Sequence, residues 1–167
     1  MKARRILGID PGSRITGFGI IEVHGDQSLC VTQGVIRAGN EAFPQRLGTI
    51  FSGVQVLISE YRPELAAIET VFVSHNPGSA LKLGQARGAA VCAAIAAGLA
   101  VAEYSPRSIK QAIVGRGAAD KQQVQHMVRI LLQLSEVLAE DAADALAVAL
   151  CHQHTSQTLE RMRRMQG

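Results

Sequence analysis

Carboxylates that follow apolar segments are the residues of this chain best suited to chemistry. Asp10 follows the run ILGI, and Glu69 follows the run LAAI. A charged side chain at the end of a buried strand is costly unless a cation or hydrogen bonds compensate its charge. Asp141 and Asp144 lie three residues apart in a helical stretch, so they share one face of that helix. Two carboxylates this close repel each other unless a divalent cation or a shared proton intervenes.

Each acid taken alone also has a simpler interpretation. Asp before Pro-Gly is a common turn former, and Glu69 could be a strand-end acid that faces solvent. Asp141 and Asp144 could lie on a solvated helix face near a helix N-terminus, where the helix dipole favours acids. Their combination in a chain with a net charge of +3 instead indicates a divalent-metal site that acts on an anionic partner. Oxygen ligands of this kind suit Mg²⁺ or Mn²⁺ rather than zinc, and two such ions could clamp an in-line phosphoryl displacement.

Size and composition indicate a single soluble domain. The chain has 167 residues, 47% of them hydrophobic, and only 4% aromatic, so we expect an aliphatic core. Three widely spaced cysteines argue against a disulfide framework and favour a reducing cytoplasm. The N-terminus lacks the apolar segment of a signal peptide, and the longest uncharged stretch, Gly88 to Ala102, is shorter than the roughly 20 residues that span a bilayer. We therefore expect no membrane partner.

The pattern of apolar residues predicts an α/β protein with a mixed five-stranded sheet. We expect antiparallel strands over residues 6–10, 15–23 and 29–36, and further strands over 65–69 and 99–104. Helices are predicted over residues 43–61, 79–98, 109–114, 120–134 and 140–154. This order is the ribonuclease H-like arrangement, three antiparallel strands followed by parallel strands, with helices on both faces. Residues 1–155 would form the domain, and residues 156–167 a basic, flexible tail.

This topology would bring the acids together. In a ribonuclease H-like sheet the first strand and the strand after the first helix lie side by side, so Asp10 and Glu69 would be neighbours. The last predicted helix, with Asp141 and Asp144, could then reach both of them.

Five sequence blocks resemble the RuvC family of Holliday junction resolvases. They occur in the family's order from about residue 6 to residue 152, without large insertions. The blocks are ILGIDPGSR followed by Thr16-Gly17, AIE leading into Val71-Phe72, SALKLGQARG at 79–88, DKQQVQHM at 120–127, and DAADALA at 141–147.

The resemblance implies a Mg²⁺-dependent endodeoxyribonuclease that resolves Holliday junctions in homologous recombination and DNA repair. Asp10, Glu69, Asp141 and Asp144 match the catalytic acids that hold the metal ions, two Mg²⁺ per subunit, with Mn²⁺ as a substitute. Asp10 is the best candidate to bridge both ions, and Asp141 would either ligate a metal or orient the attacking water. Hydrolysis in strands related by symmetry would leave 5′-phosphate and 3′-hydroxyl ends.

The same resemblance assigns DNA-binding roles to other residues. Lys110 and Lys121 match basic residues near the scissile phosphate, where a cation would offset charge in the transition state. Phe72 matches an aromatic residue that stacks on or separates bases at the junction centre; the alternative is a core residue under its loop.

Four-way junction DNA, a second copy of the chain and a branch-migration motor complex are the partners that the resemblance implies. The predicted helix over residues 79–98 carries a surface of small residues, including Gly84 and Gly88. We expect part of this helix in a homodimer interface with two-fold symmetry, although part could pack on the protein's own sheet.

Two other functions remain possible on sequence grounds. Actin-like or sugar-kinase-like ATPases also open with a strand that ends in Asp-x-Gly, but they need two domains and a second glycine-rich loop, which this chain lacks. A non-catalytic junction-binding protein with structural acids is the second alternative. The sequence CHQH at 151–154 matches no common zinc-site spacing.

Overall fold

A five-stranded sheet forms the centre of the molecule. The computed structural model describes residues 3–72 and 76–166. Within them the strands are ordered β3-β2-β1-β4-β5. β1 pairs antiparallel with β2 and β2 with β3, whereas β4 lies parallel to both β1 and β5. The mixed sheet predicted from the sequence is therefore confirmed. The bounds are β1 (Arg4–Asp10), β2 (Ile15–His24), β3 (Gln27–Arg37), β4 (Leu65–Glu69) and β5 (Ala100–Tyr104).

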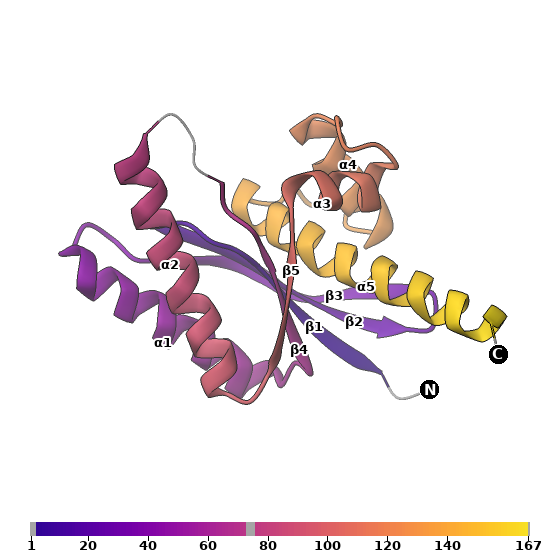
Figure 1. Cartoon of the computed structure of the whole chain (residues 1–167), viewed down its shortest axis with the longest axis horizontal. Helices are drawn as coiled ribbons and strands as arrows, with labels where there is room; N and C mark the ends of the chain where they lie inside the picture. The colour runs from indigo at the N-terminus through magenta and orange to yellow at the C-terminus, as the bar shows by residue number, and fades with distance from the viewer. Residues whose placement is uncertain (1–2, 73–75, 167) are drawn as a thin grey trace.

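Helices cover both faces of the sheet (Figure 1). On one face lie α1 (Phe43–Tyr61) and α2 (Pro77–Ala96), and on the other lie α3 (Pro106–Val114), α4 (Lys121–Leu131) and α5 (Glu140–Gln166). Each face has its own buried cluster of mostly aliphatic side chains and alanines. Among the described residues, no helix combines the length and hydropathy needed to cross a bilayer.

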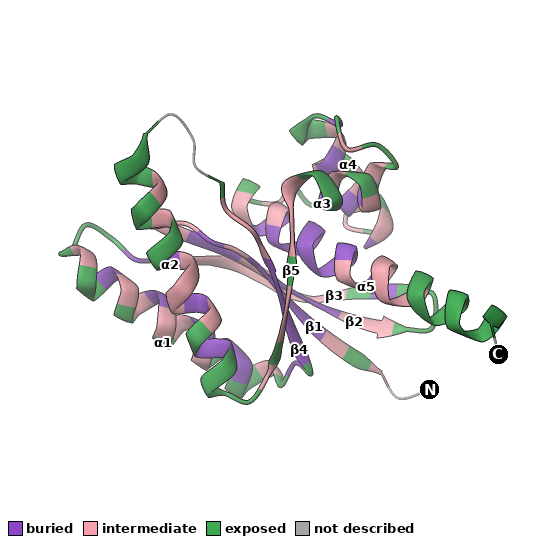
Figure 2. Cartoon of the chain, in the orientation of Figure 1, coloured by how far each residue is buried: buried purple, intermediate pink, exposed green. Residues whose placement is uncertain are grey.

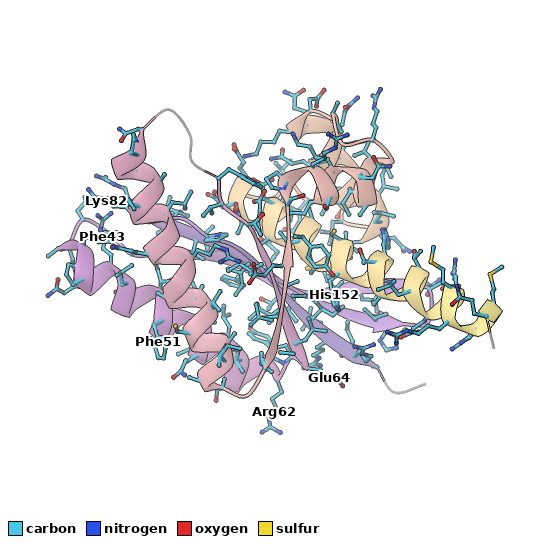
Figure 3. All side chains as sticks on the ribbon, viewed as in Figure 1. Phe43, Phe51, Arg62, Glu64, Lys82 and His152 are labelled. Atoms are coloured by element: carbon cyan, nitrogen blue, oxygen red, sulfur yellow. The ribbon has the colours of Figure 1, made fainter. Side chains whose placement is uncertain are left out.

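α1 ends just before Pro63, as the position of this proline predicts. Arg62 adopts a left-handed conformation with φ of 50°, and its N–H donates to the carbonyl oxygen of Ile58. Pro63 follows, and the residue before a proline disfavours the helical conformation. The Nζ of Lys82 in α2 lies 5.9 Å from the centre of the Phe43 ring in α1, and both residues are labelled in Figure 3. This contact joins the first turn of α1 to the second turn of α2.

Some predicted helix bounds were wrong. α3 begins at Pro106 rather than residue 109, because the Ser105 side chain accepts a hydrogen bond from the Ser108 N–H and caps the helix. α4 ends at Leu131 rather than residue 134, because Gln133 adopts a left-handed conformation with φ of 53°. α2 spans Pro77–Ala96 instead of 79–98.

The last helix is longer than predicted. The sequence predicted an end near His154, but α5 continues to Gln166 because no glycine or proline interrupts it. Gln157 Nε2 donates to the carbonyl oxygen of Gly25 at 2.8 Å, and Arg161 Nη2 lies 3.1 Å from Asp26 Oδ1. These contacts attach the added turns to the turn between β2 and β3. Beyond them the helix is exposed, as the green C-terminal end in Figure 2 shows.

Candidate active site

Asp10 and Glu69 lie side by side at the carboxyl ends of two parallel strands. β1 and β4 pair in register up to Ile9 and Ile68, so the next residue of each strand is one of the acids. Side chains alternate between the two faces of a strand. Because Ile9 and Ile68 are buried in the cluster under α1 and α2, Asp10 and Glu69 belong to the opposite face, which α5 covers.

Glycines in the sheet allow the first turns of α5 to lie directly on it. Gly17 pairs with Asp10 across β1 and β2, and a Cβ at Gly17 would lie 2.0 Å from the carbonyl oxygen of Asp141. A Cβ at Gly8 would lie 2.0 Å from the carbonyl oxygen of Ala145. No other residue type leaves room for the helix backbone at this distance. The close approach brings the acidic turn of α5 to the strand ends.

A pocket of about 370 Å³ forms where these elements meet. Its lining includes all four predicted acids and both predicted lysines: Asp10, Glu69, Asp141, Asp144, Lys110 and Lys121. The acids come from β1, β4 and α5, and the lysines from α3 and α4. The structure thus gathers residues that are far apart in the sequence into one concave site.

The pocket strongly disfavours further negative charge. Burial raises the pKa of Asp10 to about 8, with further contributions from the charges of Glu69 and Asp144 and from a hydrogen bond shared with Glu69. Burial also raises the pKa of Glu69, although the hydrogen bond with Asp10 and the charges of Lys121 and Lys110 oppose this. In the absence of a cation, Asp10 therefore retains a proton at a pH where an isolated aspartate is ionised, and it shares this proton with Glu69 through their hydrogen bond.

Lys121 forms ion pairs with two acids of α5. Its Nζ lies 2.9 Å from Asp144 Oδ2 and also contacts Glu140 Oε1. Burial alone would lower the pKa of Lys121, but the hydrogen bonds to Glu140 and Asp144 outweigh it and raise that pKa. Burial raises the pKa of Asp144 despite the opposing effect of Lys121. The lysine is therefore a permanent positive charge at the mouth of the acidic pocket.

Phe72 lies outside the pocket but close to it along the chain. It follows β4 by three residues, and 66% of its surface is exposed. This exposure excludes the alternative that Phe72 is a core residue under its loop. Its ring is therefore accessible to a partner.

The donor set fits a hard divalent cation, provided that side chains move. Within residues 3–72 and 76–166, no group of three or more His, Cys, Asp and Glu side chains is already arranged to hold a metal ion. In this arrangement Lys121 compensates the negative charge of Asp144. The hydrogen bond between Asp10 and Glu69 reduces the repulsion between these two carboxyl groups. Oxygen donors that are compensated only by a proton and a lysine are suited to Mg²⁺ or Mn²⁺ once the side chains rotate toward the ion.

The side chains of CHQH at 151–154 contact different parts of the protein. Tyr104 Oη and His152 Nδ1 are 2.8 Å apart, and His152 is labelled on α5 in Figure 3. His154 Nδ1 donates to the carbonyl oxygen of Ala112 at 3.1 Å, and Cys151 Sγ donates to that of Ser108 at 3.7 Å. These contacts are structural and hold α5 against β5 and α3.

A larger cavity, of about 860 Å³, lies at the opposite end of the sheet. Arg4, which begins β1, lies there and pairs with Glu64 at 3.6 Å and with Glu160 at 4.0 Å. Arg161 in the same cavity pairs with Asp26. Most of its charges are already compensated by exposed ion pairs, so the smaller acidic pocket is the better candidate for catalysis.

Sequence reasoning missed two charged residues at the site. Glu140 contacts Lys121, and Arg87 of α2 donates from Nε to the carbonyl oxygen of Glu69 at 3.0 Å. Glu140 precedes Asp141 directly and resembled an ordinary acid at a helix start. Arg87 is an arginine on a helix whose buried face is otherwise alanine, and this contrast was the available signal.

Comparisons with known proteins identify the family of this chain. The profile of the family described as crossover junction endodeoxyribonuclease RuvC matches residues 6–152. A relative with that name from Dichelobacter nodosus is 59% identical and covers 93% of this chain and 88% of its own length. A relative of the same name from Marinobacter nauticus is also 59% identical, with coverage of 97% and 93%.

Solved structures extend the comparison to three dimensions. Thermus thermophilus RuvC, solved in complex with Holliday junction substrate, is 35% identical with a TM-score of 0.87 and covers 93% of this chain and 96% of its own. The yeast mitochondrial Holliday junction resolvase Ydc2 is 15% identical with a TM-score of 0.74, with coverage of 97% and 82%, and shows the shared fold. The match to the family profile and the identity and coverage of these relatives show that this chain belongs to the RuvC family of crossover junction endodeoxyribonucleases.

Proposed function

We propose that this protein is a structure-selective endonuclease that resolves Holliday junctions in homologous recombination and DNA repair. One observation carries the proposal: four carboxylates and two lysines of a RuvC-family chain line one pocket. Lysines flanking an acidic, metal-type site match a phosphodiester substrate, because the acids alone would repel DNA. The related Thermus thermophilus RuvC was solved with Holliday junction substrate, which supports this substrate class.

The acidic residues would hold two Mg²⁺ ions per subunit, with Mn²⁺ as a substitute. When bound, such ions stabilise negative charge on a phosphate and lower the pKa of a water molecule. Asp10, at the end of the central strand β1, would be the ligand shared by both ions, and Glu69 and Asp144, which line the same pocket, would ligate them as well. Asp141 either completes the ligand set or orients the attacking water. Cleavage would leave 5′-phosphate and 3′-hydroxyl ends.

Lys110 and Lys121 would contact the scissile phosphate. A fixed cation next to this phosphate offsets the charge that builds up in the transition state. Lys121 is held by Asp144 and Glu140 in the protein alone, so it is already oriented at the pocket. When a divalent ion compensates Asp144, the Nζ of Lys121 can turn to the DNA while Glu140 retains its position.

Phe72 would contact the bases at the centre of the junction. Its ring is exposed and follows Glu69 by three residues, and stacking on an accessible base would contribute about 1–3 kcal/mol. The branch point of a four-way junction interrupts base stacking and leaves base faces accessible, whereas a continuous duplex does not. This difference would favour junctions over duplex DNA.

Two copies of the chain would act together, since a four-way junction needs two symmetric cuts. In α2, Ala86 and Ala90 are buried on the protein's own side, whereas added Cβ atoms at Gly84 and Gly88 would meet open space. Leu81 of the same helix is 69% exposed. We propose that this open part of α2 lies in a two-fold homodimer interface. A branch-migration motor remains a predicted partner.

The expected location is the cytoplasm. The DNA substrate and the free cysteines agree with this expectation.

A cleavage assay with matched DNA substrates tests this proposal. A synthetic four-way junction and a duplex of the same arm sequence are incubated with the protein, either in Mg²⁺ or in EDTA. We expect paired nicks in the junction only in Mg²⁺, and no cleavage of the duplex. Junction binding without cleavage in Mg²⁺ would favour the non-catalytic junction-binding protein, and ATP turnover would favour the ATPase.

A further inference from the structure

Arg87 of α2 reaches across the carboxyl ends of two strands. Its Nε donates to the carbonyl oxygen of Glu69 in β4 at 3.0 Å, and its Nη2 lies 2.9 Å from Glu103 Oε2 in β5. Only 19% of the Arg87 side chain is exposed, although arginine is among the residues least often buried. Removing a guanidinium from water is costly unless strong contacts compensate it, so its placement requires an explanation.

The contact stabilises the end of β4 at the position of a predicted metal ligand. Pairing between β1 and β4 ends at Ile9 and Ile68, so Glu69 lies just beyond the last paired residue on that side. On its other side Glu69 pairs with Tyr104 of β5. The hydrogen bond from Arg87 therefore holds the backbone of Glu69 where the ladder to β1 has stopped, and a bond from a charged donor is stronger than a neutral one.

α2 contacts the end of β4 through Arg87, which holds the Glu69 carbonyl. The start of α2 is capped by Asn76, whose side chain accepts a hydrogen bond from the N–H of Ser79. Any movement of α2 would therefore be transmitted to the position of Glu69.

We propose that Arg87 is a positioning residue that fixes the backbone of Glu69, and through it the Glu69 carboxylate, for metal binding. The inference rests on the proposed function of the acidic pocket. Arg87 does not line that pocket, and its contacts with Glu69 and Glu103 hold it among protein groups. Its effect is therefore expected on metal binding before any DNA is present.

Metal titration of the DNA-free protein tests this inference. Mn²⁺ binding is measured by calorimetry for the full-length wild type, Arg87→Met and Glu103→Gln. Loss of a group that orients a ligand typically weakens metal affinity about 10–100-fold, and we expect Arg87→Met to lie in this range. Glu103→Gln is the matched control, because it removes the carboxylate charge but retains the bond between Arg87 and Glu69. It should bind Mn²⁺ like the wild type.

Further variants separate positioning from a general loss of folding. A structural role alone would lower the melting temperature of Arg87→Met and leave Mn²⁺ affinity unchanged. If Arg87→Met does not fold, Arg87→Lys, which retains one charged donor, should fold and show a smaller loss of affinity. In a Glu69→Gln background, Arg87→Met should weaken Mn²⁺ binding no further, because Arg87 acts through Glu69.

The outcomes also distinguish this inference from the proposed function. Wild-type Mn²⁺ affinity in a folded Arg87→Met or Arg87→Lys variant would overturn the positioning role, whatever the DNA assays show. The Mg²⁺ concentration for half-maximal junction cleavage should rise in parallel with the loss of Mn²⁺ affinity. Failure of the wild type to cleave junctions would contradict the proposed function but leave the metal titration as a test of Arg87.

Discussion

Gly17 of β2 and Asp141 of α5 are in such close contact that a Cβ at Gly17 would lie 2.0 Å from the Asp141 carbonyl oxygen. The same glycine pairs with Asp10 across the sheet. The distance between the acidic turn of α5 and the acid of β1 therefore depends on a missing side chain. The geometry of the pocket is set by backbone packing as well as by its charged residues.

Gly17→Ala should reduce activity more than the small volume of the added methyl group suggests. The added methyl group must move the start of α5 away from the sheet, at a cost of about 1–3 kcal/mol in stability. Displacing Asp141 and Asp144 by about 1 Å should reduce the rate of junction cleavage by roughly 100-fold. The measurements are thermal unfolding and single-turnover cleavage.

Gly48→Ala is the matched control for this substitution. Gly48 lies in α1, where an added Cβ would meet open space, so alanine should stabilise the helix by up to about 1 kcal/mol and leave cleavage unchanged. Equal cleavage by Gly17→Ala and Gly48→Ala would contradict the role of close packing at the pocket.

The raised pKa of Asp10 predicts a specific pH dependence of stability. Its pKa is raised from 3.8 to about 8 in the folded protein, so between these values the native state binds more protons than the unfolded state. Without metal, stability should therefore fall as pH rises through this interval, by at most about 1.4 kcal/mol per pH unit from this group. Urea unfolding in EDTA from pH 5 to pH 8 measures the slope.

Asp10→Asn removes this titration. The variant should be less sensitive to pH than the wild type over the same interval and more stable near pH 7. Mn²⁺ should stabilise the wild type increasingly as pH rises, because the ion replaces the proton. Identical slopes for the two proteins in EDTA would show that Asp10 is not protonated in the fold.

Lys121 should matter for catalysis far more than for folding. The Lys121 side chain is about half exposed, and ion pairs of such residues contribute roughly 0–1 kcal/mol to stability. Removal of a preorganised charge at the reacting phosphate typically lowers the rate by about 100–1,000-fold, and we expect this for Lys121→Met. Arg161→Met, which removes an exposed ion pair at the far end of the sheet, is the control and should cleave normally. A Lys121→Met enzyme with wild-type rates would place Lys121 outside the catalytic site.

Phe72→Ala should separate junction recognition from metal binding and folding. Loss of stacking worth about 1–3 kcal/mol corresponds to a decrease of roughly 5- to 150-fold in junction cleavage. Because Phe72 is exposed, the melting temperature and Mn²⁺ affinity should remain at wild-type values. Val56→Ala, at an exposed apolar residue of α1, should change none of these quantities. A large loss of stability in Phe72→Ala would instead indicate a packing role.

The sequence predicted the acidic pocket because local signals marked each acid and the expected topology brought the segments together. Asp10 and Glu69 each follow an apolar strand, and strand order made them neighbours. Asp141 and Asp144 share a helix face by spacing alone. The contact between Arg87 and a backbone carbonyl could not be predicted, because it depends on how α2 lies across β4 and β5.

The length of α5 was also underestimated from the sequence, because contacts between distant segments stabilise its last turns. Residues after His154 lose the apolar pattern, so the sequence indicated a frayed tail. Their polar side chains are instead tied to the turn between β2 and β3, where Gln157 meets Gly25 and Arg161 meets Asp26. Contacts of this kind join segments that are distant in the sequence and leave no periodic signal.

Cleavage of a synthetic four-way junction in Mg²⁺ by the wild type and by Asp10→Asn tests the central claim most directly. Asp10→Asn retains the shape of the side chain but removes the charge that would bridge the ions, so it should bind the junction and leave it intact. The wild type should introduce symmetric nicks that a ligase can seal. Full cleavage by both Asp10→Asn and Glu69→Gln would contradict the claim that these carboxylates form the metal site of a junction resolvase.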